Sequence, residues 1–112
     1  MDIFWIVLTL YMNNMEVENK LKSILGEFFR DSFYNDAIKN LRKSLYDNNY
    51  ENWDKVVWTI INRELENGKP LYLIHNTANL PLDENTDDEA YKWFNLMLIN
   101  SMGSIDSPII EY

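Results

Sequence analysis

The side chains best suited to chemistry lie in an acidic stretch near the C-terminal end of the chain. Asp83, Asn85 and Asp87 stand at every second position, which is how a calcium-binding loop begins. Such a loop also needs a glycine at its sixth position, for a sharp turn, and a bidentate glutamate at its twelfth. The chain has Asp88 and Phe94 there. We therefore predict neither a metal ion nor another cofactor, and interpret the acids as exposed residues at the start of a helix.

Other residue types that catalyse reactions are scattered. His75 is the only histidine, and only carboxylates could join it in binding a metal. The three glycines are isolated, so no glycine-rich phosphate loop is present. No serine has the sequence context of a nucleophile elbow, and the chain contains no cysteine. We predict that the protein is not an enzyme, and keep a small metal-dependent or carboxylate-based enzyme as an alternative hypothesis.

The charge of the chain is strongly negative and unevenly distributed. The net charge is −8, and Lys92 is the only lysine or arginine after position 69. Nucleic acids and anionic membranes are poor partners for such a chain, because binding phosphate requires clustered Lys and Arg. A basic protein is the complementary partner. We predict that the following residues bind it: Asp83, Glu84, Asp87, Asp88, Glu89, Tyr91, Asp106 and Glu111.

The one basic cluster consists of Lys39, Arg42 and Lys43. Asp36 precedes Lys39 by one helical turn, and Asp47 follows Lys43 by another, which is the spacing of ion pairs on a helix surface. We predict that the cluster lies on the surface of a helix, away from its apolar stripe.

Apolar residues at helical spacing predict an all-α fold, a small bundle of four to five helices. The predicted helices cover about residues 15–30, 34–47, 51–67 and 86–102. The third is apolar on two sides, including Trp58 and Ile61, so we expect it to be central. Thr86 and Glu89 have the spacing of a capping box at the start of the fourth.

Two short apolar runs are ambiguous. Residues 71–74 (LYLI) could form a short strand or an extended buried connector. Residues 3–12 (IFWIVLTLYM) are too few to span a membrane and lack the features of a signal peptide. They could dock on the core as a strand or helical turn, or precede a true start at Met12 or Met15. We predict a dispensable segment 1–11 and a single domain 12–112.

Two stretches of the chain carry a family resemblance. The segment ANLPLDENTDDEAYKWF and the earlier segment FFRDSFYNDAIKNLRKSLYDNNYENWDKVVWTIINREL resemble immunity proteins of bacterial contact-dependent growth inhibition systems. The resemblance covers the chain from about residue 15 onward. It implies a cytoplasmic protein that binds and neutralises the C-terminal toxin domain of a partner protein, often a nuclease such as a tRNase. The alternative is an acidic adaptor or regulatory domain that binds another basic protein.

Overall fold

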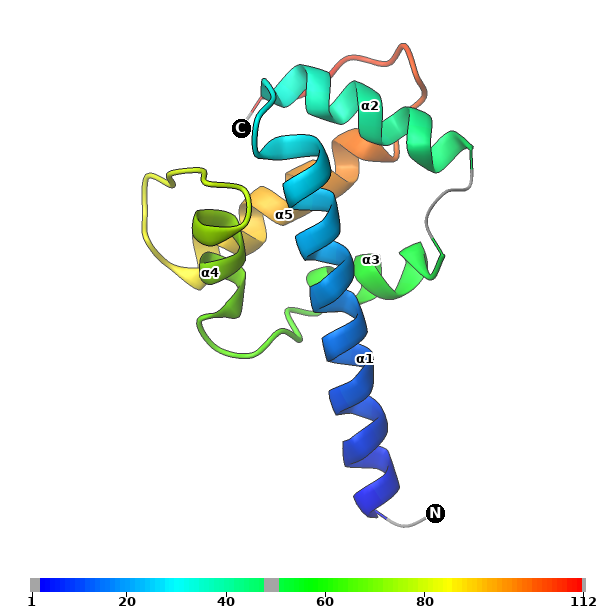
Figure 1. Cartoon of the computed structure of the whole chain (residues 1–112), viewed down its shortest axis with the longest axis vertical. Coiled ribbons are helices and arrows are strands. Elements are labelled where there is room, and N and C mark those ends of the chain that lie inside the picture. The colour runs from blue at the N-terminus through cyan, green and yellow to red at the C-terminus, as the bar shows by residue number, and fades with distance from the viewer. Residues whose placement is uncertain (1–2, 48–50, 112) are drawn as a thin grey trace.

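The computed structural model describes residues 3–47 and 51–111, and all regular structure in these ranges is helical (Figure 1). Within them, the side chains of residues 9–11 and 13 are not described. The prediction of an all-α fold is confirmed. The elements are α1 (Ile3–Ile24), a π-helical turn η1 (Leu25–Phe29), α2 (Tyr34–Tyr46), α3 (Trp53–Ile61), α4 (Lys69–Asn76) and α5 (Asp87–Ser101).

Helix α5 is the element around which the domain packs. It contacts α2, α3 and α4, and in Figure 1 it crosses behind α1. Its buried side chains project in several directions, and its apolar ones are Ala90, Tyr91, Trp93, Phe94, Met97 and Leu98. Burying a helix on several sides requires neighbours around it, and the other helices provide them.

The prediction that the third helix is central is wrong. Helix α3 buries one face through Val56 and Ile60, while Trp58 is 66% exposed and Ile61 is 62% exposed. The helix also ends earlier than predicted. Arg63 adopts a left-handed backbone conformation (φ 52°), and its N–H donates to the carbonyl of Ile60. The N–H of the next residue donates back to the carbonyl of Thr59, which completes a Schellman motif and ends the helix.

The apolar stripe predicted for residues 15–30 is confirmed. Val17, Leu21 and Ile24 are buried in α1, and the buried residues of η1 are Leu25, Phe28 and Phe29. The N–H of Arg30 donates to the carbonyl of Leu25, which closes the wider π-helical turn. The chain then bends at Ser32 and enters α2, which contacts η1.

Residues 71–74 are neither a strand nor an extended connector. They belong to α4, which follows Gly68 in a left-handed conformation (φ 83°) and has Pro70 in its first turn. Proline is favoured there because the first N–H groups of a helix have no partner within it. Four consecutive apolar residues are too few to show a helical period, which explains why the sequence did not distinguish the alternatives.

Arg42 is buried and does not lie on an exposed helix surface. Its side chain is 3% exposed and contacts the end of α5 and the tail that follows. The Nε atom donates to the carbonyl of Asn100 (2.7 Å). The two terminal nitrogens donate to the carbonyls of Ser107 (2.7 Å) and Pro108 (3.3 Å). The cation therefore lies at the negative end of the α5 dipole and fastens an irregular tail to α2.

The first turns of α1 project away from the packed domain (Figure 1). Ile3 is 75% exposed and Val7 is 60% exposed, and the three residues between them are exposed as well. The radius of gyration is 14.3 Å, against about 13 Å for a compact domain of this length. The difference agrees with a projecting helix end that packs little against the core.

Replacing Arg42 should destabilise the whole domain. In an Arg42→Met variant, the carbonyl oxygens of Asn100, Ser107 and Pro108 lose their donor, so we expect a loss of about 2–4 kcal/mol in unfolding free energy. Chemical denaturation measures this loss. A Lys39→Met variant removes an exposed cation from the same helix and is the control. Equal stability of the two variants would contradict the role assigned to Arg42.

Removing residues 1–11 should leave the domain folded. The side chains of residues 3–7 are exposed, so their removal eliminates little buried area. A chain that begins at Met12 should keep its helical circular dichroism and unfold cooperatively, with higher solubility. Loss of cooperative unfolding in this shortened chain would show that the segment belongs to the core.

Candidate functional site

The acidic residues between positions 83 and 89 have different roles in the structure. Asp83 and Glu84 lie exposed in the loop that connects α4 to α5. Neither forms a salt bridge with another residue in the described part of the chain. Their carboxylates therefore face solvent and are open to a partner.

Asp87 has a structural task that the sequence did not indicate. One carboxylate oxygen accepts a hydrogen bond from the N–H of Gly68 (2.6 Å), and the other accepts one from the N–H of Leu71 (3.2 Å). These groups lie at the start of α4, where backbone N–H groups have no partner within the helix. Asp87 thus caps α4 from the first residue of α5, and the two helices are joined at their N-terminal ends.

Asp88 is paired with two cations. One oxygen contacts Arg63 (2.6 Å) and the other contacts Lys92 (3.2 Å). The hydrogen bond from Arg63, followed by that from Lys92, holds the pKa of Asp88 below its usual value of 3.8. The same contact with Asp88 raises the pKa of Lys92. The sequence showed only Lys92 near these acids, because Arg63 arrives from the end of α3.

One of the two hydrogen bonds of the predicted capping box is present at the start of α5. The N–H of Glu89 donates to the hydroxyl of Thr86 (3.2 Å). The N–H of Thr86 donates to the carbonyl of Glu84 (2.9 Å), in the place that the Glu89 carboxylate takes in a complete capping box. Glu89 is half-buried beside this cap.

Tyr91 lies beneath the surface. Its side chain is 6% exposed, and its hydroxyl exchanges hydrogen bonds with the backbone of Leu65 (3.1 and 3.4 Å). Burial raises the pKa of the Tyr91 phenol above its ordinary value of 10.0. The residue holds the turn after α3 against α5, so it supports the surface from below.

Asp106 and Glu111 are exposed in the tail, beyond the far end of α5 from the acidic stretch. The structure therefore does not bring all the predicted residues into one patch. Of the predicted acids, four are exposed and outside any salt bridge of the described residues; we call them the open carboxylates: Asp83, Glu84, Asp106 and Glu111.

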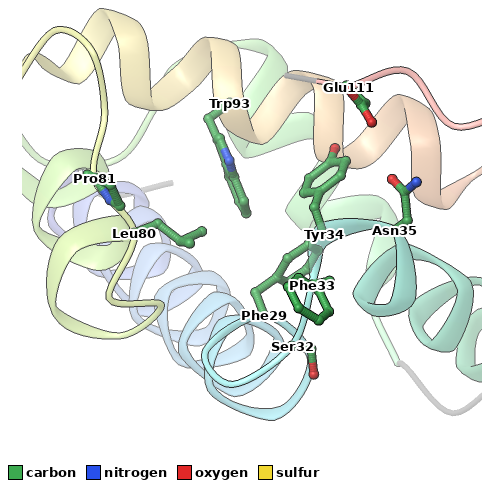
Figure 2. Close-up of a pocket in the computed structure, with 9 residues that line it drawn as sticks. All are labelled: Phe29, Ser32, Phe33, Tyr34, Asn35, Leu80, Pro81, Trp93 and Glu111. Atoms are coloured by element: carbon green, nitrogen blue, oxygen red, sulfur yellow. The ribbon is translucent and has the colours of Figure 1, made fainter.

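An aromatic pocket lies beside the loop that carries Asp83 and Glu84, and Glu111 is part of its lining. Its volume is about 450 Å³, and it opens between α2, α5, the loop before α5 and the tail (Figure 2). Its lining residues are Phe29, Ser32, Phe33, Tyr34, Asn35, Leu80, Pro81, Trp93 and Glu111. Pro81 is close in sequence to Asp83, so the loop that forms one wall also carries two open carboxylates.

Rings packed edge to face form the inner part of this pocket. The ring centroids of Phe29 and Trp93 are 5.2 Å apart, and those of Tyr34 and Trp93 are 6.2 Å apart. The side-chain amide of Asn100 donates to the Tyr34 hydroxyl (2.8 Å). Burial raises the pKa of the Tyr34 phenol, and the hydrogen bond from Asn100 opposes that rise. The pocket therefore presents aromatic rings and a neutral phenol, with Glu111 at its edge.

No local sequence pattern predicts this pocket. Phe29, Tyr34 and Trp93 come from three elements, and Glu111 comes from a tail without a periodic pattern. The only available signal was the phenylalanine–tyrosine pair at positions 33 and 34, where a helix begins.

Comparisons with known proteins identify no relative: no family model, no curated protein and no solved structure matches the chain. Among the described residues, no group of three or more histidine, aspartate or glutamate side chains is placed to hold a metal ion. In residues 3–47 and 51–111, no helix is long and apolar enough to cross a membrane.

Because Asp87 caps a helix and Asp83 is exposed, replacing each of them should change the unfolding free energy by a different amount. An Asp87→Ala variant removes the acceptor for two N–H groups at the start of α4, so we expect it to lose about 1–2 kcal/mol of unfolding free energy. An Asp83→Ala variant should stay within about 0.5 kcal/mol of the parent, because that side chain is exposed and forms no ion pair with another described residue. Thermal and chemical denaturation of both variants test this difference. Similar values would show that Asp87 does not cap α4.

Proposed function

We propose that the protein is an immunity protein that binds and neutralises a basic toxin domain, a nuclease such as a tRNase, of a contact-dependent growth inhibition system. The observation that carries the proposal is that three of the open carboxylates, Asp83, Glu84 and Glu111, lie in the walls of the aromatic pocket or close to them in sequence. Asp83 and Glu84 extend from the loop at one wall, and Glu111 lies at another. Interfaces are rich in aromatic residues that supply affinity, while surrounding charges select and orient the partner.

The electrostatics support a basic partner. The net charge is −8, and the loop and tail acids have no base nearby in the sequence except Lys92. Lys92 already contacts Asp88. A nuclease has a basic surface because it must hold a polyanion, and an acidic inhibitor can cover that surface. Opposite fields also speed the encounter, which benefits a protein that must act before its target does damage.

An acidic adaptor that binds another basic protein remains the alternative. It accounts for the same charge and the same pocket. The neighbouring gene distinguishes the two functions, because an immunity gene should directly follow the gene of a large toxin.

The proposal is tested by co-expressing the chain with the C-terminal domain encoded immediately upstream. We expect a stable complex that co-purifies and has lost the toxicity of that domain. If the two proteins form no complex, or if the complex is as toxic as the free domain, the immunity function is wrong.

The open carboxylates of the loop should control the rate of association with that domain. An Asp83→Asn/Glu84→Gln variant should associate about three- to tenfold more slowly at low salt. The reason is that electrostatic attraction of the basic partner weakens when charge is removed from the surface that meets it. The difference should shrink at high salt, where the charges are screened.

The matched control is Asp47→Asn/Asp54→Asn. It makes the same change in net charge at the junction of α2 and α3, away from the pocket. Stopped-flow measurements at two salt concentrations compare the two variants. Equal rates for both would mean that net charge alone steers the partner and that the loop is not at the interface.

A further inference from the structure

We propose that the aromatic pocket binds an arginine side chain. The assignment of this arginine to a toxin domain rests on the proposed function. The affinity of the pocket for a guanidinium group is independent of that function. The proposal follows from three features of the pocket: its aromatic walls, its single carboxylate and its exposed phenylalanine.

The walls suit a flat cation. Phe29, Tyr34 and Trp93 form the inner part, and Phe33 stands at the mouth (Figure 2). A guanidinium group is planar, loses less hydration than an ammonium group on binding, and stacks on aromatic rings. The cavity of about 450 Å³ leaves room for the apolar stem of such a side chain as well.

The charge of the lining favours a cation over an anion or a neutral group. Among the described residues that line the pocket, only Glu111 is charged. It forms no salt bridge with a described residue. Its carboxylate can therefore receive the two parallel hydrogen bonds that arginine donates and lysine does not.

Phe33 is exposed without a packing reason. Its side chain is 84% exposed, although it belongs to the turn that joins η1 to α2. A second hollow, on the other side of Phe33, is lined by Arg30, Asp31, Ser32, Phe33 and Asp36. Arg30 repels a cation there, so the aromatic pocket is the better site for arginine, while Asp31 and Asp36 add to the negative field around Phe33.

The tail that carries Glu111 is held in place from inside the domain. The Asn100 side chain accepts a hydrogen bond from the N–H of Ile110 (2.9 Å) and donates one to its carbonyl (2.8 Å). The same amide group donates to the Tyr34 hydroxyl. One buried residue thus fixes both the phenol of the pocket and the residue next to its carboxylate, which reduces the ordering needed on binding.

The proposal is tested with the full chain and Nα-acetyl-arginine amide, followed by NMR. A single stacked and ion-paired side chain should bind with millimolar affinity, so the titration extends to about 50 mM. We expect saturable shifts in residues that line the aromatic pocket, including the Trp93 indole. The corresponding citrulline amide has the same shape without the charge and should bind at least about fivefold more weakly.

Two variants remove the features that define the site. Phe33→Ala and Glu111→Gln should each weaken binding of the arginine amide about two- to fivefold. Tyr46→Ala removes an equally prominent exposed aromatic ring from the other end of α2, and Asp106→Asn removes a carboxylate elsewhere in the tail. Both controls should bind like the parent chain. All four positions are exposed, so the fold should survive in each variant.

Three results would overturn the proposal: no saturable shift up to the highest concentration, equal binding of the citrulline amide, or equal affinity of the site variants and their controls. The same variants separate this inference from the proposed function when they are mixed with the upstream-encoded domain. If that domain binds all of them equally, the pocket is not at the interface although the immunity function stands. If the arginine amide binds but the domain does not, the pocket stands and the immunity function falls.

Discussion

A buried guanidinium group fastens the C-terminal tail to the rest of the domain. Arg42 reaches from α2 to carbonyl oxygens at the end of α5 and in the tail, and no carboxylate of the described residues forms an ion pair with it. Removing a charge from water is unfavourable, so the cation needs all these acceptors, and the carbonyls in turn need a donor. Asn100 adds a second attachment through the backbone of Ile110. Residues 102–111 form no helix. These hydrogen bonds therefore help to hold them against α2.

The attachment of the tail places Glu111 at the edge of the aromatic pocket, far in sequence from Phe33 and Tyr34. At the opposite wall, the loop before α5 is held because Asp87 caps α4 and because the Thr86 hydroxyl caps α5. The fold thus uses some acids to connect helices and leaves others open to solvent. A neutralising change in the first group acts on stability, whereas a change in the second should act on binding.

Local patterns predicted much of this fold, because an apolar stripe is repeated over several turns in the helices around Leu21, Ile38 and Phe94. The apolar pattern did not predict α4, because its apolar run is too short to show a helical period. It also did not predict the end of α3, because the left-handed residue that ends this helix is Arg63 and not a glycine. The position of Arg42 was misjudged because a charged residue was assumed to be exposed; it lies one turn after Ile38 and so shares the buried face. The pocket could not be predicted, since its walls meet only through tertiary contacts.

The central claim is that the basic partner covers the pocket and the loop beside it. Hydrogen–deuterium exchange of the chain, alone and in complex with the upstream-encoded toxin domain, tests it directly. The account predicts that slower exchange on binding is concentrated in residues 31–35, 79–86 and 107–111, which surround the pocket. Slower exchange confined to the exposed face of α3, around Trp58 and Ile61, would contradict it and place the interface on that apolar surface.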